Sequence, residues 1–468
     1  MDQVGKRLVA EGIISEEQLE QALERQKCSG GRIGQNLIAL GFIDQGQLEA
    51  LFRRHPAPPL TVEETGVEFG MLCELALRQL LFMGDFRMSD LAERIRLPLP
   101  VVDAILELLR REKLIEVKGG GSFASVSYTF KISEPGRQRA AELFELCRYT
   151  GPAPVSLEAY RQMVELQSIK SIVIGEEKVR QAFAPMVVSD DLLRRLGPAI
   201  SSGKSLFVYG PPGNGKTAIA ETIGAVLPDQ VYVPHAVTVG GQIIAIYDPV
   251  SHQAWDGGTP AADIDQRWVA IKRPVIMAGG ELTLRMLELE YNPLSRFYEA
   301  PLQMKANNGL FIIDDFGRQQ IDPQQLLNRW IVPLDRRIDF LALHTGMKFC
   351  IPFDMLVVFS TNLEPKQLVD EAFLRRIRYK ILIDHPSEAE YGEIFRRVCE
   401  RQGVRFEQDA YCFLMEQCYR AHGVQPNACH PRDIIDHIVD AAHYYQHPPV
   451  MSRESLLAAW RNYFVELA

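Results

Sequence analysis

The sequence contains no apolar run close to the roughly 20 residues that a helix needs to cross a bilayer, so we expect no membrane insertion. Its first residues lack the basic segment and apolar core of a secretion signal, which predicts a cytoplasmic protein. The eight cysteines include no C-x-x-C pair, and this argues against zinc and redox motifs. Lysine and arginine together number 51 against 60 acidic residues, so a general nucleic-acid binder is not expected.

What is present is the composition of an ordinary globular protein, with 47% apolar and 24% charged residues. At roughly 150 residues per domain, 468 residues predict about three folding units. Strand-like runs that alternate with helices up to about residue 385 predict a parallel α/β sheet, and the pattern after it is helical only. Apolar patterns and Pro-Gly breaks divide the chain into segments 1–55, 56–68, 69–150, 151–385 and 386–468.

The amino-terminal segment contains an internal repeat with a constant offset of 29 residues. Each copy predicts a short helix, a glycine that ends it, and a second amphipathic helix, over 16–26 in the first copy and 45–54 in the second. The prolines of segment 56–59 then predict a stiff linker. The recurring residues are Gly5, Leu8, Gly12, Ile14, Gln18 and Leu19, which return as Gly34, Leu37, Gly41, Ile43, Gln47 and Leu48.

Segment 69–150 predicts three helices followed by a hairpin, an order that resembles a winged helix-turn-helix. Residues 69–148 hold twelve basic and eleven acidic residues, without a basic stripe. The helix opened by Pro100 stands in the place of a recognition helix, but Asp103 and Glu107 lie in its first half, where a DNA reader meets base edges. DNA binding is therefore the less favoured hypothesis, and a protein or interdomain adaptor is the favoured one.

A glycine-rich segment lies between the strand-like 206–209 and the helical 218–226. It reads G-x-x-x-x-G-K-T in the strand-loop-helix order that this phosphate-binding motif requires. Its glycines allow backbone N–H groups to converge on phosphate oxygens, while Lys216 can reach the β and γ phosphates and Thr217 can ligate magnesium. We therefore predict an ATP and Mg²⁺ site formed by Gly210, Pro211, Pro212, Gly213, Asn214, Gly215, Lys216 and Thr217.

Two later apolar strands also end in polar residues. The strand 310–313 runs into Asp314 and Asp315, where one carboxylate can hold magnesium and the other can orient or deprotonate a water molecule. The strand 355–359 leads to Asn362, which can place an amide beside that water. Many strands end in aspartate, so the order of these features carries more weight than each feature alone.

This succession resembles the AAA+ ATPases over residues 168–468. The resemblance implies that Asn362 is sensor 1, that Arg375 or Arg376 reaches the γ-phosphate in the neighbouring subunit, and that Arg432 contacts the nucleotide from a helical lid. An arginine that acts in trans requires a homo-oligomer, most often a hexameric ring in this family. The implied fold class is an α/β AAA+ P-loop parallel sheet with a helical lid, preceded by a small helical repeat domain and a winged helix. Solvated helix ends are the alternative for the arginines.

Two further stretches separate these motifs. The apolar stretch 340–349 resembles the hairpin inserted before sensor 1 in MoxR-type chaperone ATPases and in enhancer-binding transcription activators, both of which remodel proteins. Lys216 and Asp314 lie 314 − 216 = 98 residues apart, so extra structure is predicted between 232 and 308, as a substrate-facing element or as ordinary packing.

Asp315 stands where the family usually has glutamate, and the shorter side chain predicts slow hydrolysis as one alternative.

The two 29-residue units resemble the MshEN domain at the amino end of type II secretion and type IV pilus ATPases, which binds cyclic di-GMP. The second unit carries this pattern with Arg32 and Gly34, and Arg32 has the chemistry to stack on or hydrogen-bond a guanine. Gln3 and His55 depart from the pattern. A purely structural repeat or a protein-docking module is the alternative.

The sequence thus predicts a ring-forming ATPase that remodels or moves a protein partner under the control of cyclic di-GMP. Its partner is a protein substrate or a machinery of the secretion or pilus type. Two alternatives stay open: a DNA-binding transcriptional regulator with an ATPase switch, and a nucleotide-bound scaffold with little turnover.

Overall fold

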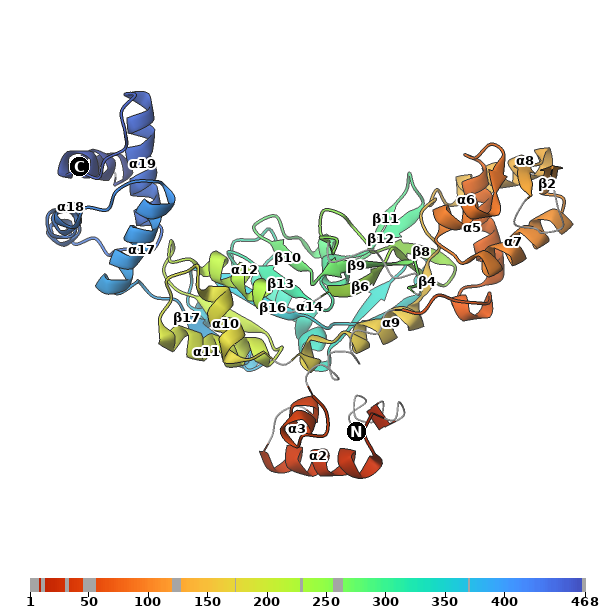
Figure 1. The fold of residues 1–468 in the computed structure, drawn as a ribbon, viewed down its shortest axis with the longest axis horizontal. Helices are drawn as coiled ribbons and strands as arrows, with labels where there is room; N and C mark the ends of the chain where they lie inside the picture. The colour runs from red at the N-terminus through yellow and green to blue at the C-terminus, as the bar shows by residue number, and fades with distance from the viewer. Residues whose placement is uncertain are drawn as a thin grey trace.

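The computed structural model describes residues 8–9, 13–29, 33–44, 56–119, 128–172, 174–227, 230–255, 264–368 and 371–464. In Figure 1 a helical lid, a parallel sheet, a second sheet and a mostly helical unit follow one another in a row. The predicted α/β class, a parallel sheet surrounded by helices, is confirmed. None of the described helices has the length and apolar character needed to cross a membrane.

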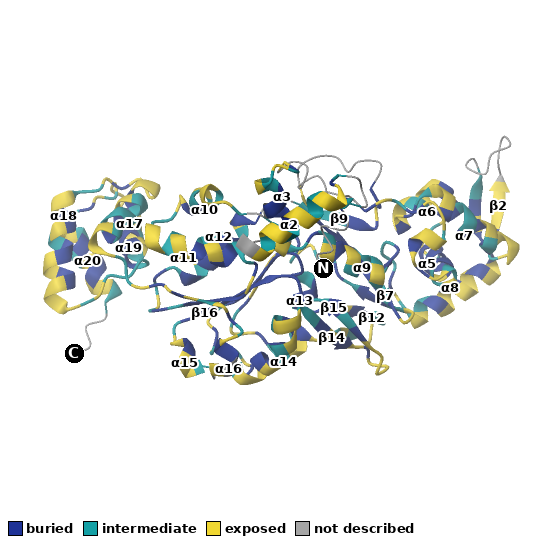
Figure 2. Cartoon of the chain, turned by 90° about the horizontal axis from the view of Figure 1, so that it is seen from below, coloured by how far each residue is buried: buried dark blue, intermediate teal, exposed yellow. Residues whose placement is uncertain are grey.

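The parallel sheet has the strand order β10-β13-β16-β5-β17. Its strands are almost entirely apolar because both faces are covered, and Figure 2 shows β16 as buried. Alternate residues enter two cores: Phe311 and Phe359 pack with α14, while Ile312 and Val358 pack with α12. The strands are β5 (Leu206–Tyr209), β10 (Val275–Ala278), β13 (Leu310–Ile313), β16 (Leu356–Thr361) and β17 (Tyr379–Leu382).

Helices and short turns connect and cover these strands. The segment before the sheet forms α9 (Leu157–Leu166), η3 (Ile169–Ser171), α10 (Glu176–Phe183) and α11 (Asp190–Ser201). Those between and after the strands are α12 (Lys216–Val226), η4 (Leu284–Leu287), α13 (Leu302–Lys305), α14 (Pro323–Arg336), α15 (Pro365–Leu368) and α16 (Glu371–Leu374).

A second five-stranded sheet, of order β11-β12-β8-β7-β4, occupies most of the stretch for which extra structure is predicted. The strands β7 and β8 form an antiparallel hairpin, and β4 joins the sheet from a segment that precedes the glycine-rich loop 210–217, the P-loop. The strands are β4 (Val155–Ser156), β7 (Ala236–Val239), β8 (Gln242–Ala245), β11 (Glu290–Asn292) and β12 (Phe297–Glu299). Two separate antiparallel pairs are β6 (Gln230–Pro234) with β9 (Trp268–Lys272), and β14 (Ile338–Ala342) with β15 (Lys348–Pro352).

The hairpin β14–β15, expected before sensor 1, is fastened to the second sheet. The Tyr298 hydroxyl on β12 contacts Nδ1 of His344 and accepts a hydrogen bond from its backbone N–H (3.0 Å). At the same turn, Met347 lies so close to Gly240 that a side chain on Gly240 would meet its sulfur. The hairpin is therefore held at its tip, and the strand that follows it, β16, carries Asn362 just beyond its end.

The unit formed by residues 69–150 has the predicted three helices and hairpin, with one more strand and one more helix. We call it the winged-helix-like unit. Its sheet has the order β1-β3-β2, and its core includes Ala236 and Ile243 of the second sheet. The unit and the second sheet thus share one apolar core. Its elements are α5 (Phe69–Leu80), β1 (Phe86–Arg87), α6 (Met88–Ile95), α7 (Leu99–Arg111), β2 (Ile115–Gly119), β3 (Thr129–Ile132) and α8 (Glu134–Leu146).

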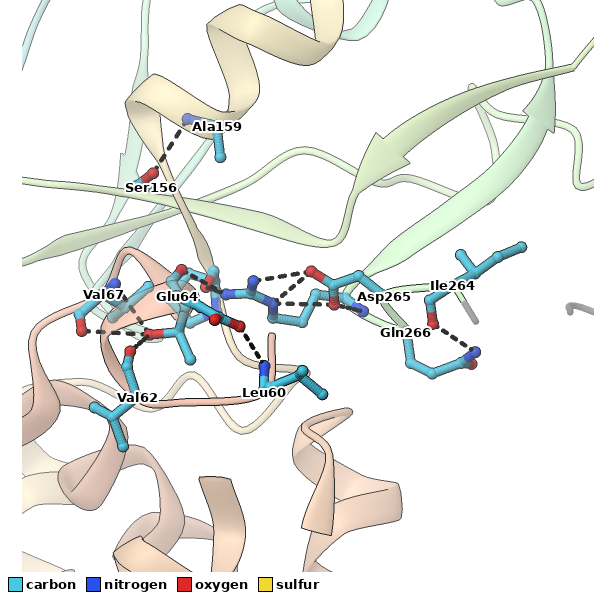
Figure 3. Close-up of polar contacts among 12 residues, drawn as sticks. Leu60, Val62, Glu64, Val67, Ser156, Ala159, Ile264, Asp265 and Gln266 are labelled. Atoms are coloured by element: carbon cyan, nitrogen blue, oxygen red, sulfur yellow. Dashed lines mark hydrogen bonds and ion pairs between the residues drawn. The ribbon is translucent and has the colours of Figure 1, made fainter. Parts of the chain in front are cut away.

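The proline-rich linker is attached to the second sheet's neighbourhood by a buried ion pair (Figure 3). Asp265 N–H donates to the carbonyl of Pro56 (2.7 Å), and its carboxylate pairs with Arg267 (2.8 Å). The same guanidinium donates to the carbonyls of Thr65 (2.9 Å), at the end of η1 (Glu63–Thr65), and of Pro154 (3.2 Å). One arginine therefore ties together three segments that are distant in sequence.

Residues at equivalent positions of the two copies of the amino-terminal repeat pack in the same way. Leu8 and Leu37 are fully buried in one small core with α2 (Glu16–Ser29) and α3 (Ile33–Ala39). The Leu8 carbonyl accepts from Ile13 N–H (3.0 Å), and the Leu37 carbonyl accepts from Phe42 N–H at the same distance, 29 residues later. The helix predicted over 45–54 lies outside the described residues.

The carboxyl-terminal segment 386–468, which we call the lid, is helical over its described residues, as its pattern predicts. Its core is rich in aromatic residues such as Tyr391, Tyr419 and Trp460. The second helix of this segment continues from α-helix into a π-helical stretch. The elements are α17 (Glu388–Arg401), α18 (Gln408–Phe413), η5 (Leu414–Arg420), α19 (His430–Tyr444) and α20 (Arg453–Tyr463).

Candidate functional site

The glycine-rich loop connects the end of β5 to the first residue of α12. Gly210, Gly213 and Gly215 have φ values of +143°, +77° and +80°, which side-chain-bearing residues rarely adopt. A Cβ on Gly210 would also overlap the carbonyl oxygen of Ile383. The loop therefore needs its glycines, and it ends in a helix N-terminus where free N–H groups favour a phosphate.

The Lys216 side chain is buried within this loop. Its ammonium donates to the carbonyls of Gly210 (3.0 Å) and Pro211 (2.7 Å). Burial lowers the pKa of Lys216, and the carboxylates of Asp315 and Asp314 act in the opposite direction. A cation that is largely removed from water and held by two carbonyls fits the role predicted for it, contact with phosphate oxygens.

Thr217 and Asp314 meet across the gap between α12 and β13. The Thr217 hydroxyl lies 2.9 and 3.1 Å from the two carboxylate oxygens of Asp314. Asp314 is fixed in turn by its own N–H, which donates to the Ala278 carbonyl at the end of β10 (2.9 Å). A hydroxyl and a carboxylate are hard oxygen ligands of the kind that Mg²⁺ takes, so the pair fits the predicted metal site.

Asp315 and Asn362 form a second pair beside the first. The Asn362 amide donates to Asp315 Oδ1 (3.0 Å), because β13 and β16 are neighbours and end at the same edge. Asp315 has a φ of +49°, an uncommon conformation for a residue with a side chain. The structure thus brings the two predicted carboxylates to one edge, each with a different polar partner.

Two residues to which the motifs assign no role organise this edge. Gln319 accepts from Gly317 N–H (2.8 Å) and donates to the Asp314 carbonyl (2.7 Å). Thr361 donates from its hydroxyl to the Phe316 carbonyl (2.8 Å). These contacts fix the turn after β13. The only sequence signal for them is their position within a few residues of Asp314 and Asn362.

The lid contacts the P-loop directly through Ala428 and Cys429, for which no motif predicts a role. Cys429 N–H donates to the Gly213 carbonyl (2.8 Å), and Ala428 N–H donates to Asn214 Oδ1 (3.0 Å). A Cβ on Gly213 would lie 2.6 Å from Cys429 Sγ. The buried amide nitrogen of Asn214 has no hydrogen-bond partner among the described residues.

The predicted arginines lie on the surface of the single chain. Arg375 is exposed at the end of α16. Arg376 donates to Asp335 (2.9 Å), and Arg432, in the first turn of α19, donates to its neighbour Asp433 (3.3 Å). For the proposed guanine site, Gly34 is buried in α3, whereas Arg32 lies outside the described residues.

Comparisons with known proteins place only part of the chain. Residues 387–462, which correspond to the lid, match a family described as a domain of unknown function, DUF8689. A point mutant of RuvB from Thermotoga maritima is 13% identical, with 63% of this chain and 72% of that chain covered and a TM-score of 0.33.

NtrX from Brucella abortus in complex with ADP is 12% identical over 62% of this chain and 59% of its own, with a TM-score of 0.38. A RuvB described as a Holliday junction branch migration motor, also from Thermotoga maritima, is 15% identical over 64% and 73%, with a TM-score of 0.32. Likeness at these scores carries no information on the function of this chain.

Proposed function

We propose that the chain is an ATPase of the AAA+ type that binds ATP with Mg²⁺ and hydrolyses it. The observation that carries this proposal is the pair of adjacent carboxylates at the end of β13, where Asp314 contacts Thr217 and Asp315 contacts Asn362. One pair has the chemistry of a metal site and the other that of a water-positioning site. Lys216, the first residue of α12, holds its ammonium at the helix N-terminus, where the helix dipole also favours phosphate.

Each residue then has one role. Thr217 and Asp314 hold Mg²⁺, which supplies positive charge to the phosphates. Lys216 and the loop N–H groups bind the β and γ phosphates, while Asn362 and Asp315 orient the attacking water. Asp315 accepts the proton as the water oxygen bonds to the γ-phosphorus and the bond to the bridging oxygen breaks, with its electrons leaving on ADP.

We propose a homo-oligomeric ring, of the hexameric type most often found in the AAA+ family. This part of the proposal depends on an arginine that acts in trans on the neighbouring subunit. Arg376 is already paired with Asp335, whereas Arg375 is exposed, so we assign the trans contact to Arg375. Arg432 stands one turn from Cys429, which touches the P-loop, and this supports its contact with nucleotide in its own subunit. We propose a protein as the partner that the ATPase acts on. The shared core of the winged-helix-like unit and the second sheet supports this, because it would let the unit serve as an adaptor between partner and ATPase.

Turnover of two variants tests the proposal. Lys216→Ala is expected to lower phosphate release by at least about a hundredfold, because it removes a charge from the phosphoryl site. Asp315→Asn is expected to lower it by about a hundredfold while ATP binding is retained. Lys204→Ala, an exposed lysine just before β5, is the control.

A nucleotide-bound scaffold is the second candidate. It is favoured by the short Asp315 side chain and its hydrogen bond to Asn362, which together leave less reach toward a water. If the unmodified protein binds ATP but releases phosphate no faster than Lys216→Ala, the scaffold replaces the ATPase. If it binds no ATP, both fail.

For the amino-terminal repeat we propose cyclic di-GMP binding, supported by the equivalent packing of its two copies. Calorimetry on the full chain is expected to show heat on titration with cyclic di-GMP and little heat for Arg32→Ala, which lacks the guanine-binding group. Arg25→Ala on the exposed side of α2 is the control. The absence of heat for the unmodified chain at high micromolar ligand contradicts this proposal and leaves the ATPase untouched.

A further inference from the structure

The winged-helix-like unit and the β11–β12 turn meet at the surface through three contacts. Arg148 N–H donates to the Ser295 carbonyl (2.9 Å), and Tyr149 packs edge-on against Phe297 with ring centres 5.4 Å apart. Arg296 lies 4.0 Å from the Glu145 carboxylate. A surface that crosses this boundary is thus held in one shape by contacts on both sides.

Large apolar side chains gather on that surface. Phe82, Leu146 and Leu294 are 57%, 67% and 76% exposed, far more than apolar residues that cover a core. Phe82 meets Phe144 edge to face (5.1 Å between ring centres), and the Arg148 guanidinium lies over the Phe144 ring (5.6 Å). We call Phe82, Phe144, Leu146 and Leu294 the joint surface. Leu146 lies two residues before Arg148, and Leu294 lies next to Ser295, whose carbonyl accepts from Arg148 N–H, so these exposed side chains lie around Arg148. Exposed apolar side chains grouped in this way mark a site of protein association.

The charge beneath and around the joint surface is unbalanced. Arg148 and Arg296 share a single carboxylate, that of Glu145. Arg78 lies beneath, 4% exposed, and donates to the Cys147 carbonyl (3.0 Å). Its Nε has no hydrogen-bond partner, and no carboxylate of the described residues forms an ion pair with Arg78. Three guanidinium groups therefore face one carboxylate.

The neighbouring groups do not correct this excess. Glu142 on α8 is paired with Arg139 (3.2 Å), so that pair is neutral. The Ser295 hydroxyl is buried at the same junction, and within the part of the chain that the structure describes it has no hydrogen-bond partner. The solvent-accessible guanidinium groups of Arg148 and Arg296, next to exposed apolar side chains, favour a partner that supplies both apolar groups and negative charge.

We propose that the joint surface docks an amphipathic, acidic segment of a protein partner, with apolar residues on one face and Asp or Glu beside them. Apolar anchors on a helix seat on an apolar surface, and the flanking carboxylates meet Arg148 and Arg296. Nucleic acid fits less well, since interfaces with its backbone are polar rather than apolar. That this partner is the one moved by ATP hydrolysis rests on the proposed function; the docking itself does not.

The position of the surface connects docking to the nucleotide site. Leu294 stands at the turn of β11–β12, and β12 carries Tyr298, which contacts His344 in the hairpin before β16. A partner bound at the joint surface is therefore attached to the part of the chain that leads to Asn362.

Fluorescence anisotropy with the full chain tests the proposal. The probes are two labelled helical peptides of about 18 residues with Leu and Phe at helical spacing, one flanked by Glu and the other by Lys. The Glu peptide is expected to bind saturably and at least about tenfold more tightly than the Lys peptide. Leu146→Ser with Leu294→Ser is expected to weaken it by about tenfold or more, and Arg296→Glu to reverse the preference.

Val250→Ser is the matched control, because Val250 is 96% exposed on a loop outside the joint surface. Equal binding of both peptides, no saturable binding, or no effect of the substitutions overturns the proposal. The proposal is also overturned if the unmodified chain is an oligomer and the variant Leu146→Ser with Leu294→Ser is a monomer, because the surface then binds a second copy of the chain. Phosphate release is measured on the same samples: turnover without peptide binding contradicts docking alone, and peptide binding without turnover contradicts the ATPase alone.

Discussion

The parallel sheet is joined to its two neighbours in different ways. On one side, the lid reaches the P-loop through two hydrogen bonds, from Cys429 N–H to Gly213 and from Ala428 N–H to Asn214. Its α17 adds hydrogen bonds from Arg397 and Arg401 to the backbone carbonyls of residues 184–186. On the other side, the winged-helix-like unit shares an apolar core with the second sheet, and the buried Arg267–Asp265 pair ties the linker to it. The first junction is small and polar, and the second is large and mostly apolar.

This difference indicates where the molecule can move. A junction made of a few hydrogen bonds opens at a small fraction of the global unfolding free energy, whereas one with a shared core opens only when that core is exposed. We therefore expect ATP binding to move the lid relative to the P-loop. The second sheet and the winged-helix-like unit are expected to move as one body.

Removal of the buried ion pair is expected to have the largest effect on the junction between the linker and the second sheet. Arg267→Ala leaves the Asp265 carboxylate buried without its partner and frees the carbonyls of Thr65 and Pro154, so we expect a loss of about 3–5 kcal/mol in the free energy of unfolding. Urea denaturation measures it. Arg285→Ala is the control, because the Arg285–Glu290 pair is exposed and is expected to contribute no more than about 1 kcal/mol.

If the two variants lose the same stability, the second junction is not held in the way described. A double variant, Arg267→Met with Asp265→Leu, sharpens the result. It removes both charges and is expected to recover much of the loss, since the cost lies in the unpaired buried carboxylate.

A smaller effect is expected at the lid. Gly213→Ala places a methyl group 2.6 Å from Cys429 Sγ, so the lid segment cannot keep its two hydrogen bonds, together about 2 kcal/mol. Hydrogen exchange at the amides of Ala428 and Cys429, measured without nucleotide, is expected to speed up by about tenfold or more.

Gly215→Ala is the matched control for this lid experiment. Gly215 has nearly the same φ (+80° against +77° for Gly213), but among the described residues a Cβ added there meets no atom within 4 Å apart from its chain neighbours and its own helix backbone. Equal acceleration in both variants shows that backbone strain rather than the Cys429 contact is responsible. Adding Cys429→Ala to Gly213→Ala is expected to slow exchange again, because the clashing sulfur is gone.

The sequence predicts those parts of the site that are formed by short runs of neighbouring residues. The P-loop, Asp314 and Asn362 follow apolar strands, and parallel strands end at one edge, so their meeting follows from the pattern. The fold class follows from the same alternation of strands and helices. The roles of Arg375 and Arg32 stay predictions.

The contacts that join distant segments could not be predicted. β4 has only two residues, too few for a periodic pattern, yet it adds a strand to the second sheet. The Arg267–Asp265 pair matches no motif and acquires its role only when the linker folds against it. Gly213 and Cys429 lie in different segments, and only the packing of the lid brings them together.

The smallest effect expected is a pH dependence of the lid. Nδ1 of His430 accepts a hydrogen bond from Asn427 N–H (3.3 Å) and contacts the Tyr419 hydroxyl (3.0 Å), next to the segment that touches the P-loop. Burial lowers the pKa of His430 to about 4, with Asp433 opposing and His385 adding to the shift. A protonated ring cannot accept the bond from Asn427, so the folded lid favours the neutral form.

The unfolded chain, with a histidine pKa near its ordinary 6.5, therefore binds more protons between pH 6.5 and 4, and stability falls as the pH drops through that window. With allowance for solvent screening, we expect a loss of about 1 kcal/mol between pH 7 and pH 5, measured by urea denaturation. In His430→Gln this component is expected to disappear, whereas His447→Gln, at the exposed end of the same region, keeps it. An unchanged pH dependence in His430→Gln would place the acid-sensitive contact elsewhere, and the lid junction would then be no more sensitive to acid than the second one.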